Sequence, residues 1–529
     1  MPSLDVSELN IVISVFGSFI ILYGFASVKV KQVWFLGEAL PAVILGIVLG
    51  PLAARFIDAE RWGSAAPEQQ NAITLGVTRV MIGLQLVIAG FQLPAKYQLT
   101  RWKEMLLCLI PIMTVMWLCT TACILLTIPK LTLLAALVIG SCVTCTDPIL
   151  SQAIAKGPFA DRYVTRDLRE IISSEAGAND GFGFPFLMLA VYLMRHSELG
   201  TDVTSHEGVA RRSEEEVGRL GGGIGLALGN WAVETWLYIV LMSIAYGAVV
   251  GYGCRKMTKF GLRKQWIDSE SYLLYPTAMG LFLVGTCGAI GTDDLLACFV
   301  AGNALNWDGQ FLEETEKRHD EVNSSIDVLL NFGGFLEFHQ PELTGITYPR
   351  LVGLGFLVLV LRRIPAILVF YKCMPHVCKN IKEALFMGYF GPIGAGAVFY
   401  LEHTRHLFPK VEKADEGETN LLRAIGPVVY WLVLFSIVVH GLSIPALNLV
   451  YRWYGVPPIS TDAVEIKRSS VYVPAPANAV ANDSQTFLAY NRFSRPVFNQ
   501  AAVLPRWRQG GKTWDNDADS VVEILDKSR

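Results

Sequence analysis

Long apolar runs, separated by short polar stretches, make up most of the chain. A transmembrane helix needs about 20 predominantly apolar residues, and thirteen runs reach or approach that length, the two at 293–306 and 324–338 being the least secure. The pattern predicts an all-α polytopic membrane protein with about 13 transmembrane helices, at about 10–28, 34–53, 72–93, 104–128, 131–155, 169–194, 231–253, 271–290, 293–306, 324–338, 349–373, 381–401 and 424–450.

The polar stretches divide this chain into a membrane domain and a tail. Residues 195–230 and 402–422 are long polar connections between apolar runs, which predicts loops in solvent. After residue 455 the chain becomes polar and irregular, with the linker-like segment "VPAPANAVANDSQ". We therefore expect a transmembrane domain over 1–455 and a largely disordered cytoplasmic tail over 456–529.

Composition and charge agree with a membrane protein. The chain is 52% hydrophobic and 17% charged, whereas soluble domains carry roughly 25% charged residues. A formal net charge of −3 gives no support for a nucleic-acid partner. Lysine and arginine in short loops mark the cytoplasmic side. With the N-terminus outside, the short segments on the cytoplasmic side are the basic ones and the C-terminus is cytoplasmic; their basic residues include Lys96, Arg101, Lys103, Arg162, Arg166, Arg169, Arg255, Lys256, Lys259, Lys372, Lys379 and Lys382.

Two of the apolar runs are interrupted at corresponding places, seven runs apart. The fifth breaks at "TCTDP" (144–148) and the twelfth at "GPIGAGA" (391–397). Proline removes a backbone donor and glycine weakens a helix, so both sites predict broken helices. Paired broken helices in two halves of a chain indicate an inverted-repeat transporter. Their freed backbone groups must face protein or a cavity, because lipid cannot satisfy them.

Carboxylates stand inside these apolar runs, where they are costly. Charged residues such as Asp cost about 2.5–3.5 kcal/mol each at the centre of a membrane helix, which makes them functional candidates. Asp147 lies at the first break, directly before Pro148. It is both a favourable start for a half-helix and a candidate transport residue.

The sixth run holds the other acids. Glu175 and Asn179 are four residues apart and share a helix face, whereas Asp180 points about 100° further round. Glu175 needs a buried cationic partner. The eleventh run offers Arg362 and Arg363, of which only one need face the bundle. The alternative is that this run is two shorter segments with both arginines at a surface.

Asp180 then remains without a fixed counterion. A carboxylate in such a site needs a proton or a small hard cation, which prefers oxygen ligands, to neutralise it. If the two compete, the site exchanges H⁺ for a metal ion. Oxygens of Asn179, Thr146 and Asp147 are candidates to complete the shell around a transported Na⁺.

Seven motifs stand out along the chain: "TDPILSQAIAKG", "SSEAGANDGFGFPF", "SYLLYPTAMGLFLVGTCGAIGTDDLLACFVAGNALNWDG", "DVLLN", "RRIPAI", "GPIGAGAVFY" and "VVHGLSIP". Together they resemble the fungal plasma-membrane sodium/proton antiporters of the monovalent cation:proton antiporter-1 group, over roughly residues 10–455. The resemblance implies the sodium/proton antiporter fold, with two inverted six-helix repeats, a core domain that moves against a dimerising domain, and a homodimer. It also implies exchange of cytoplasmic Na⁺ and Li⁺ for external H⁺, in salt and pH homeostasis.

The resemblance also assigns roles to residues. It implies that Asp180 binds ion and proton with Asn179 beside it, that Thr146 and Asp147 lie at the crossing of the unwound helices, and that Glu175 pairs with Arg363. Many relatives outside the fungi have a ligating serine where this chain has Ala176. This departure leaves the choice between Na⁺ and K⁺ open.

Three further residues are secondary candidates. Asp293 and Asp294 match an acidic pair typical of the fungal group, and a position near a span end makes a surface or funnel role as plausible as ion binding. His440 lies within the last apolar run, either as a proton relay or as a packing histidine.

The competing functions are a cation channel or another proton-coupled transporter that uses the same acids, and a membrane enzyme. The paired broken helices argue against a channel. No GxSxG, HExxH or P-loop motif occurs in the chain, so we expect a transporter without an enzymatic activity or a cofactor.

Overall fold

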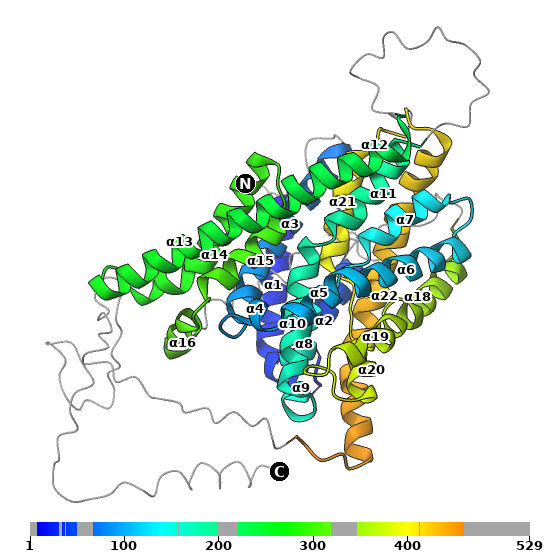
Figure 1. Ribbon diagram of the computed structural model, residues 1–529. Coiled ribbons are helices and arrows are strands. Elements are labelled where there is room, and N and C mark those ends of the chain that lie inside the picture. Colours follow the sequence, from blue (N-terminus) through cyan, green and yellow to red (C-terminus); the bar gives the residue numbers. More distant parts are fainter. Residues whose placement is uncertain are drawn as a thin grey trace, which may run out of the picture.

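The structure is a computed structural model that describes residues 8–30, 34–36, 39–49, 67–156, 158–197, 221–318, 346–411 and 413–459. Within these ranges all regular structure is helical (Figure 1). Six of the described helical segments are long and apolar enough to cross a membrane, and several shorter apolar helices accompany them. The expected span at 324–338 and tail residues 460–529 lie outside the described residues.

The described part of the N-terminal half folds into α-helices α1 to α11, with the π-helical turn η3 between α5 and α6. The long helices are α1, α3 and α6, and shorter ones follow in the region of the first expected break. The bounds are α1 Glu8–Val28, α2 Ala39–Leu49, α3 Pro67–Phe91, α4 Tyr97–Thr100, α5 Trp102–Leu107, η3 Cys108–Ile112, α6 Met113–Thr127, α7 Leu133–Cys142, α8 Pro148–Lys156, α9 Pro158–Tyr163, α10 Arg166–Gly181 and α11 Phe184–Arg195.

The C-terminal half contains the longest helices. α13 continues the π-helical segment η4, and α22 runs for 38 residues. The bounds are α12 Gly223–Asn230, η4 Trp231–Leu241, α13 Met242–Lys264, α14 Ser269–Ile290, α15 Asp294–Leu305, α16 Gln310–Lys317, α18 Tyr348–Leu361, α19 Ile364–Phe370, η6 Tyr371–Cys373, α20 Ile381–Tyr389, α21 Ala395–Leu407 and α22 Glu416–Trp453.

Both expected helix breaks are present. The chain leaves α7 after Cys142 and re-enters a helix at Pro148, and it leaves α20 after Tyr389 and re-enters at Ala395. Two more interruptions occur, of which the second matches the alternative that the eleventh run is two shorter segments. One separates α10 from α11 around Gly183, and the other separates α18 from α19 at the two arginines, just before Pro365. A glycine or a proline stands at each, and each weakens a continuous helix.

The helices form two groups. In the first, α3, α13, α14 and α15 pack on one another. Glycines permit this closeness: a side chain at Gly247 or Gly251 of α13 would collide with the backbone of α15, and one at Gly302 of α15 would collide with that of α3. Small residues that let backbones approach are typical of helix contacts in membranes.

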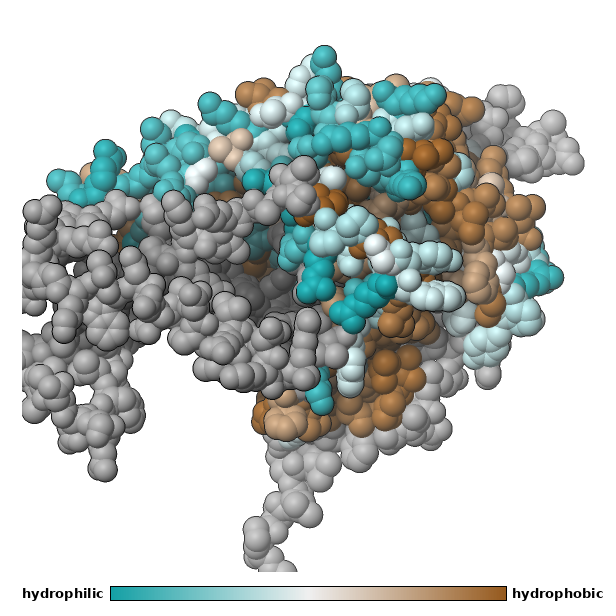
Figure 2. All heavy atoms as spheres, turned by 90° about the horizontal axis from the view of Figure 1, so that it is seen from below, coloured by the Kyte–Doolittle hydropathy of each residue, from teal (hydrophilic) through white to brown (hydrophobic). Residues whose placement is uncertain are grey.

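The second group contains α6, α7, α11, α18 and α22. α21 touches both groups, through α3 on one side and α22 on the other, and α10 packs on α8 and α15. The broken helices and α10 therefore lie where the two groups meet. Figure 2 shows broad apolar areas on the outer surface beside polar ones, as expected of a body surrounded by lipid.

Candidate functional site

The two broken helices touch where they are unwound. The backbone N–H of Asp147, in the first break, donates to the carbonyl of Pro392 in the second, at 2.8 Å. Four helix ends meet here: the C-termini of α7 and α20 and the N-termini of α8 and α21. Each end leaves backbone groups without partners inside its own helix, and no lipid can satisfy them.

Asp147 supplies acceptors to both N-terminal ends. Its Oδ1 accepts from the Leu150 N–H of α8 at 2.9 Å, and its Oδ2 accepts from the Ala395 N–H of α21 at 2.7 Å. A carboxylate at a helix N-terminus is stabilised by the helix dipole, and here one carboxylate serves two dipoles. Gly394 allows this because a side chain there would collide with the Asp147 carboxylate.

Arg362 supplies donors to both C-terminal ends. Its guanidinium donates to the carbonyls of Thr144 at 2.9 Å and Cys145 at 2.6 Å, after α7, and to that of Gly391 at 2.7 Å, after α20. The sequence analysis expected only one of the two arginines to face the bundle, or both to lie at a surface. In the structure Arg362 and Arg363 are each only 3% exposed, because the helix breaks between α18 and α19 and both side chains turn inward.

Arg363 binds Glu175. Its Nη1 and Nη2 lie 2.6 and 2.7 Å from the two oxygens of the Glu175 carboxylate, a bidentate arrangement. Its Nε also donates to the carbonyl of Met387 in α20 at 2.9 Å. The pair therefore ties α10 to the last turn of α20, just before the second break.

Asn179 ties α10 to the first break. Its Oδ1 accepts from the Thr146 N–H at 3.1 Å, and its Nδ2 donates to the Thr146 hydroxyl at 2.8 Å. Both polar atoms of the amide are therefore engaged with one residue of the unwound segment. Asn179 and Asp147 thus both hydrogen-bond to backbone groups of the broken helices. From the sequence we did not expect this role for Asn179.

Asp180 stands apart from these pairs. Its side chain is fully buried, and within the described part of the chain neither carboxylate oxygen has a hydrogen-bond partner. Gly396 of α21 lies against it, since a Cβ there would be 2.5 Å from Oδ1. Tyr400, one turn along α21, donates its hydroxyl to the Asp180 backbone carbonyl at 2.5 Å. The backbone is held while the carboxylate stays unpaired.

Asp293 and Asp294 are buried at the start of α15, at 1% and 3% exposure, so neither lies at the surface. Asp293 caps the helix, with Oδ1 accepting from the Leu296 N–H at 3.0 Å. Asp294 pairs with Arg79 of α3, whose Nε lies 2.8 Å from its Oδ2. The pair joins α15 to α3 inside the first group of helices.

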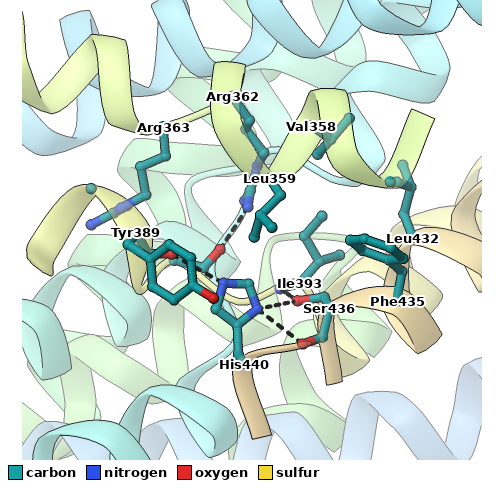
Figure 3. Close-up of a pocket in the computed structure, with 13 residues that line it drawn as sticks. Val358, Leu359, Arg362, Arg363, Tyr389, Ile393, Leu432, Phe435, Ser436 and His440 are labelled. Atoms are coloured by element: carbon teal, nitrogen blue, oxygen red, sulfur yellow. Dashed lines mark hydrogen bonds between the residues drawn. The ribbon is translucent and has the colours of Figure 1, made fainter. Parts of the chain in front are cut away.

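His440 of α22 lies beside the second break and has partners at both ring nitrogens (Figure 3). Nε2 is 3.0 Å from the Tyr389 carbonyl, and Nδ1 is 3.1 Å from the Ser436 hydroxyl, which in turn accepts from the Ile393 N–H at 2.7 Å. Nδ1 also lies 2.9 Å from the Ser436 carbonyl, so each ring nitrogen faces a backbone carbonyl. Because Tyr389 and Ile393 flank the break, His440 fastens it to α22.

This arrangement matches that of a known family. The family model described as "Sodium/hydrogen exchanger, transmembrane" matches residues 15–449. The chain belongs to the sodium/hydrogen exchanger family. It is therefore a multi-pass membrane protein of a transporter family.

Within this family the similar curated relatives are fungal, in agreement with the resemblance found in the sequence. A probable Na⁺/H⁺ antiporter of Schizosaccharomyces pombe is 34% identical over 85% of this chain. A Na⁺/H⁺ antiporter of Saccharomyces cerevisiae is 32% identical over 84% of it. The alignments cover 57% and 44% of those relatives, so the chain spans about half their length.

Solved structures support the same fold. The sodium proton antiporter MjNhaP1 from Methanocaldococcus jannaschii superposes with a TM-score of 0.55 at 14% identity, over 84% of this chain and 98% of that protein. The sodium/proton antiporter fold that the resemblance implied is thereby confirmed.

Sequence reasoning missed several residues that hold this site of the exchanger. Arg362 and Arg79 stand out in the sequence as arginines inside apolar runs. The sequence does not show which backbone carbonyls or which carboxylate they bind. Gly396 belonged to the quoted "GPIGAGAVFY" motif, where it was interpreted only as a helix breaker. The role of Tyr400 could not be predicted, because an aromatic residue in an apolar helix does not differ from the others in the sequence.

A double-mutant cycle tests the buried ion pair. Glu175→Ala leaves Arg363 buried and unpaired, and Arg363→Ala does the reverse, so each change should lower the free energy of unfolding by about 3–5 kcal/mol. The double variant should recover part of the loss. Thermal unfolding of the purified variants in detergent measures this, and strict additivity would contradict the pairing.

A second comparison separates the two aspartates. Asp147→Asn leaves only one acceptor oxygen for two helix N-termini, so a buried N–H loses its partner and stability falls by about 1–3 kcal/mol. Asp180→Asn removes no hydrogen bond of the carboxylate and removes a buried charge, so stability should stay equal or rise. Melting curves recorded side by side decide this, and a larger loss in Asp180→Asn would contradict these roles.

Proposed function

We propose that the chain is a secondary active antiporter that exchanges cytoplasmic Na⁺ for external H⁺ by alternating access, with Asp180 as the group that binds both ions in turn. The observation that carries this proposal is that the buried carboxylate of Asp180 has no hydrogen-bond partner at either oxygen among the residues that the structure describes. Family membership and the Na⁺/H⁺ antiporters among its relatives support it.

Coupling follows from the charge of this site. An isolated carboxylate in a low-dielectric interior is strongly disfavoured, so the empty, ionised site resists the passage between the two sides. Either a proton or a small cation neutralises it, and an oxygen donor suits Na⁺ or Li⁺. Since one carboxylate holds one of them at a time, each passage carries either H⁺ or the cation, which makes exchange obligatory.

The neighbouring residues give this carboxylate a firm frame. Asn179, Thr146 and Asp147 lie at the crossing beside it, and their remaining oxygen lone pairs are the nearest candidates to complete the shell of a bound Na⁺. Glu175 and Arg363 fasten α10 to the second broken helix, so the helix that carries Asp180 and the crossing form one block. We propose that this block moves against α3, α13, α14 and α15.

We also propose the domain bounds, the oligomeric state, the membrane and the orientation of the exchanger. The membrane domain covers 1–455 and functions as a homodimer in the plasma membrane, with the 456–529 tail in the cytoplasm. The distribution of lysine and arginine supports this orientation. Li⁺ is proposed as a second substrate, and transport of K⁺ is left to the test below.

The test is transport by the purified chain in proteoliposomes that contain a pH-sensitive dye. Na⁺ and Li⁺ should dissipate an imposed pH gradient with the wild type, and K⁺ is assayed alongside. Asp180→Asn should remove the response, while its melting curve stays normal. Robust exchange by folded Asp180→Asn would overturn the assignment, and no wild-type response to any of the three cations would overturn the function.

Competition between the ions predicts a particular pH dependence. Where Asp180 is mainly protonated, lowering the pH on the Na⁺ side should raise the KM for Na⁺ about tenfold per pH unit, because one proton must leave before Na⁺ binds. At higher pH the KM should level off, and the maximal rate should fall because the returning site needs a proton.

Initial rates across about pH 5–9, at several Na⁺ concentrations, measure both quantities. The activity at fixed, subsaturating Na⁺ should be bell-shaped. A KM that stays constant while only the maximal rate titrates would mean that the proton binds elsewhere, with Asp147, Asp293 and His440 as the next groups to change.

A further inference from the structure

A cavity of about 200 Å³ lies at the N-terminal end of α10. Arg166, Arg169, Glu170 and Ser173 of α10, Ala155 of α8 and Leu93 after α3 are among the residues that line it. It lies near the side where the chain leaves α22, since the Ile459 N–H donates to the carbonyl of Arg162 in α9. In the orientation proposed above, this side is cytoplasmic.

One face of α10 leads from this cavity to Asp180. Glu170, Ser173, Gly177 and Asp180 follow one another at intervals of three or four residues, so they form a single stripe along the helix. Glu170 and Ser173 line the cavity, whereas Asp180 is sealed off at 0% exposure. Gly177 is the position between the open and the sealed part of the stripe.

The ring of Phe299 lies over Gly177. A Cβ at Gly177 would be 2.5 Å from Cε2 and 2.7 Å from Cδ2 of this ring, so only glycine leaves room for it. Phe299 belongs to α15, which packs on α10, and is 3% exposed. One turn earlier in α15, the backbone of Leu296 lies against Gly181, with its N 2.5 Å from an added Cβ.

We propose that Phe299 is the barrier between the cavity and Asp180, and that its ring must leave Gly177 before an ion from this side reaches the carboxylate. A hydrocarbon ring offers no oxygen to a cation that must exchange water for ligands, so the closed contact excludes hydrated Na⁺. This inference rests on the proposed function and adds the residue that controls access to its site.

The position of Phe299 makes it suitable for this task. α15 belongs to the group with α3, α13 and α14, whereas α10 belongs to the block that carries Asp180 and the crossing. The ring therefore lies on one body and the glycine on the other. Relative movement of the two bodies separates ring from glycine without any change within either, so access is coupled to the transport movement.

The prediction is that shrinking this side chain uncouples the exchanger. Without the ring, a protein that opens to the opposite side is open to both, so Na⁺ passes without a proton. Proteoliposomes loaded with ²²Na⁺ and a pH-sensitive dye, with no initial pH gradient and with the voltage clamped by K⁺ and valinomycin, report this leak as the ²²Na⁺ efflux that is not matched by H⁺ uptake. In Phe299→Ala we expect it to rise about tenfold over wild type, equivalent to a barrier lower by about 1.4 kcal/mol.

The series Phe299→Leu, Phe299→Val and Phe299→Ala should leak increasingly as the side chain shrinks, which keeps the test valid if the alanine variant does not fold. Phe311→Ala is the matched control: Phe311 is a ring at 4% exposure in α16 that contacts Phe91 and Tyr272, away from this stripe. Its leak should equal that of the wild type.

Adding Asp180→Asn to Phe299→Ala should abolish the leak if the ion passes through the site. A wild-type leak throughout the folded members of the series, or an equal leak in Phe311→Ala, would overturn the barrier. Wild-type protein without any exchange would instead overturn the proposed function, so the two failures are distinguishable.

Discussion

Two helices that end in the middle of a membrane domain create a problem that one carboxylate and one guanidinium solve. Asp147 accepts from the N-termini of α8 and α21, and Arg362 donates to the carbonyls that follow α7 and α20. The two charged side chains and the backbone groups of the four helix ends are therefore hydrogen-bond partners of one another. Without them the crossing would expose unpaired groups where no water replaces them, and nothing would fix the position of the ion site.

Four buried acids near the crossing differ in what they bind. Asp147 is occupied by two helix ends, Glu175 by Arg363, and Asp294 by Arg79. Asp180 alone among these four has neither oxygen engaged within the described chain. The difference between these acids therefore lies in their partners rather than in residue type.

Much of this could be predicted from the sequence, for identifiable reasons. The broken helices followed from proline and glycine in apolar runs, because those residues act locally. That Glu175 needed a cation followed from burial alone. The role of Arg362 did not follow, since its partners are carbonyls more than 200 positions away in sequence at one break and 29 at the other, and any backbone offers carbonyls. The barrier at Gly177 was equally hidden, because a missing side chain gives no indication of what fills its place.

The seam between α10 and α15 has a mechanical consequence. Gly177 and Gly181 let α15 approach the backbone of α10 closely: the Phe299 ring lies over Gly177, and the Leu296 backbone lies over Gly181. Shear movements are small sliding steps between packed helices, whereas hinge movements bend the chain at a few residues. A block that slid along this seam would have to move the Phe299 ring off Gly177, so this one contact would act as a catch on the sliding.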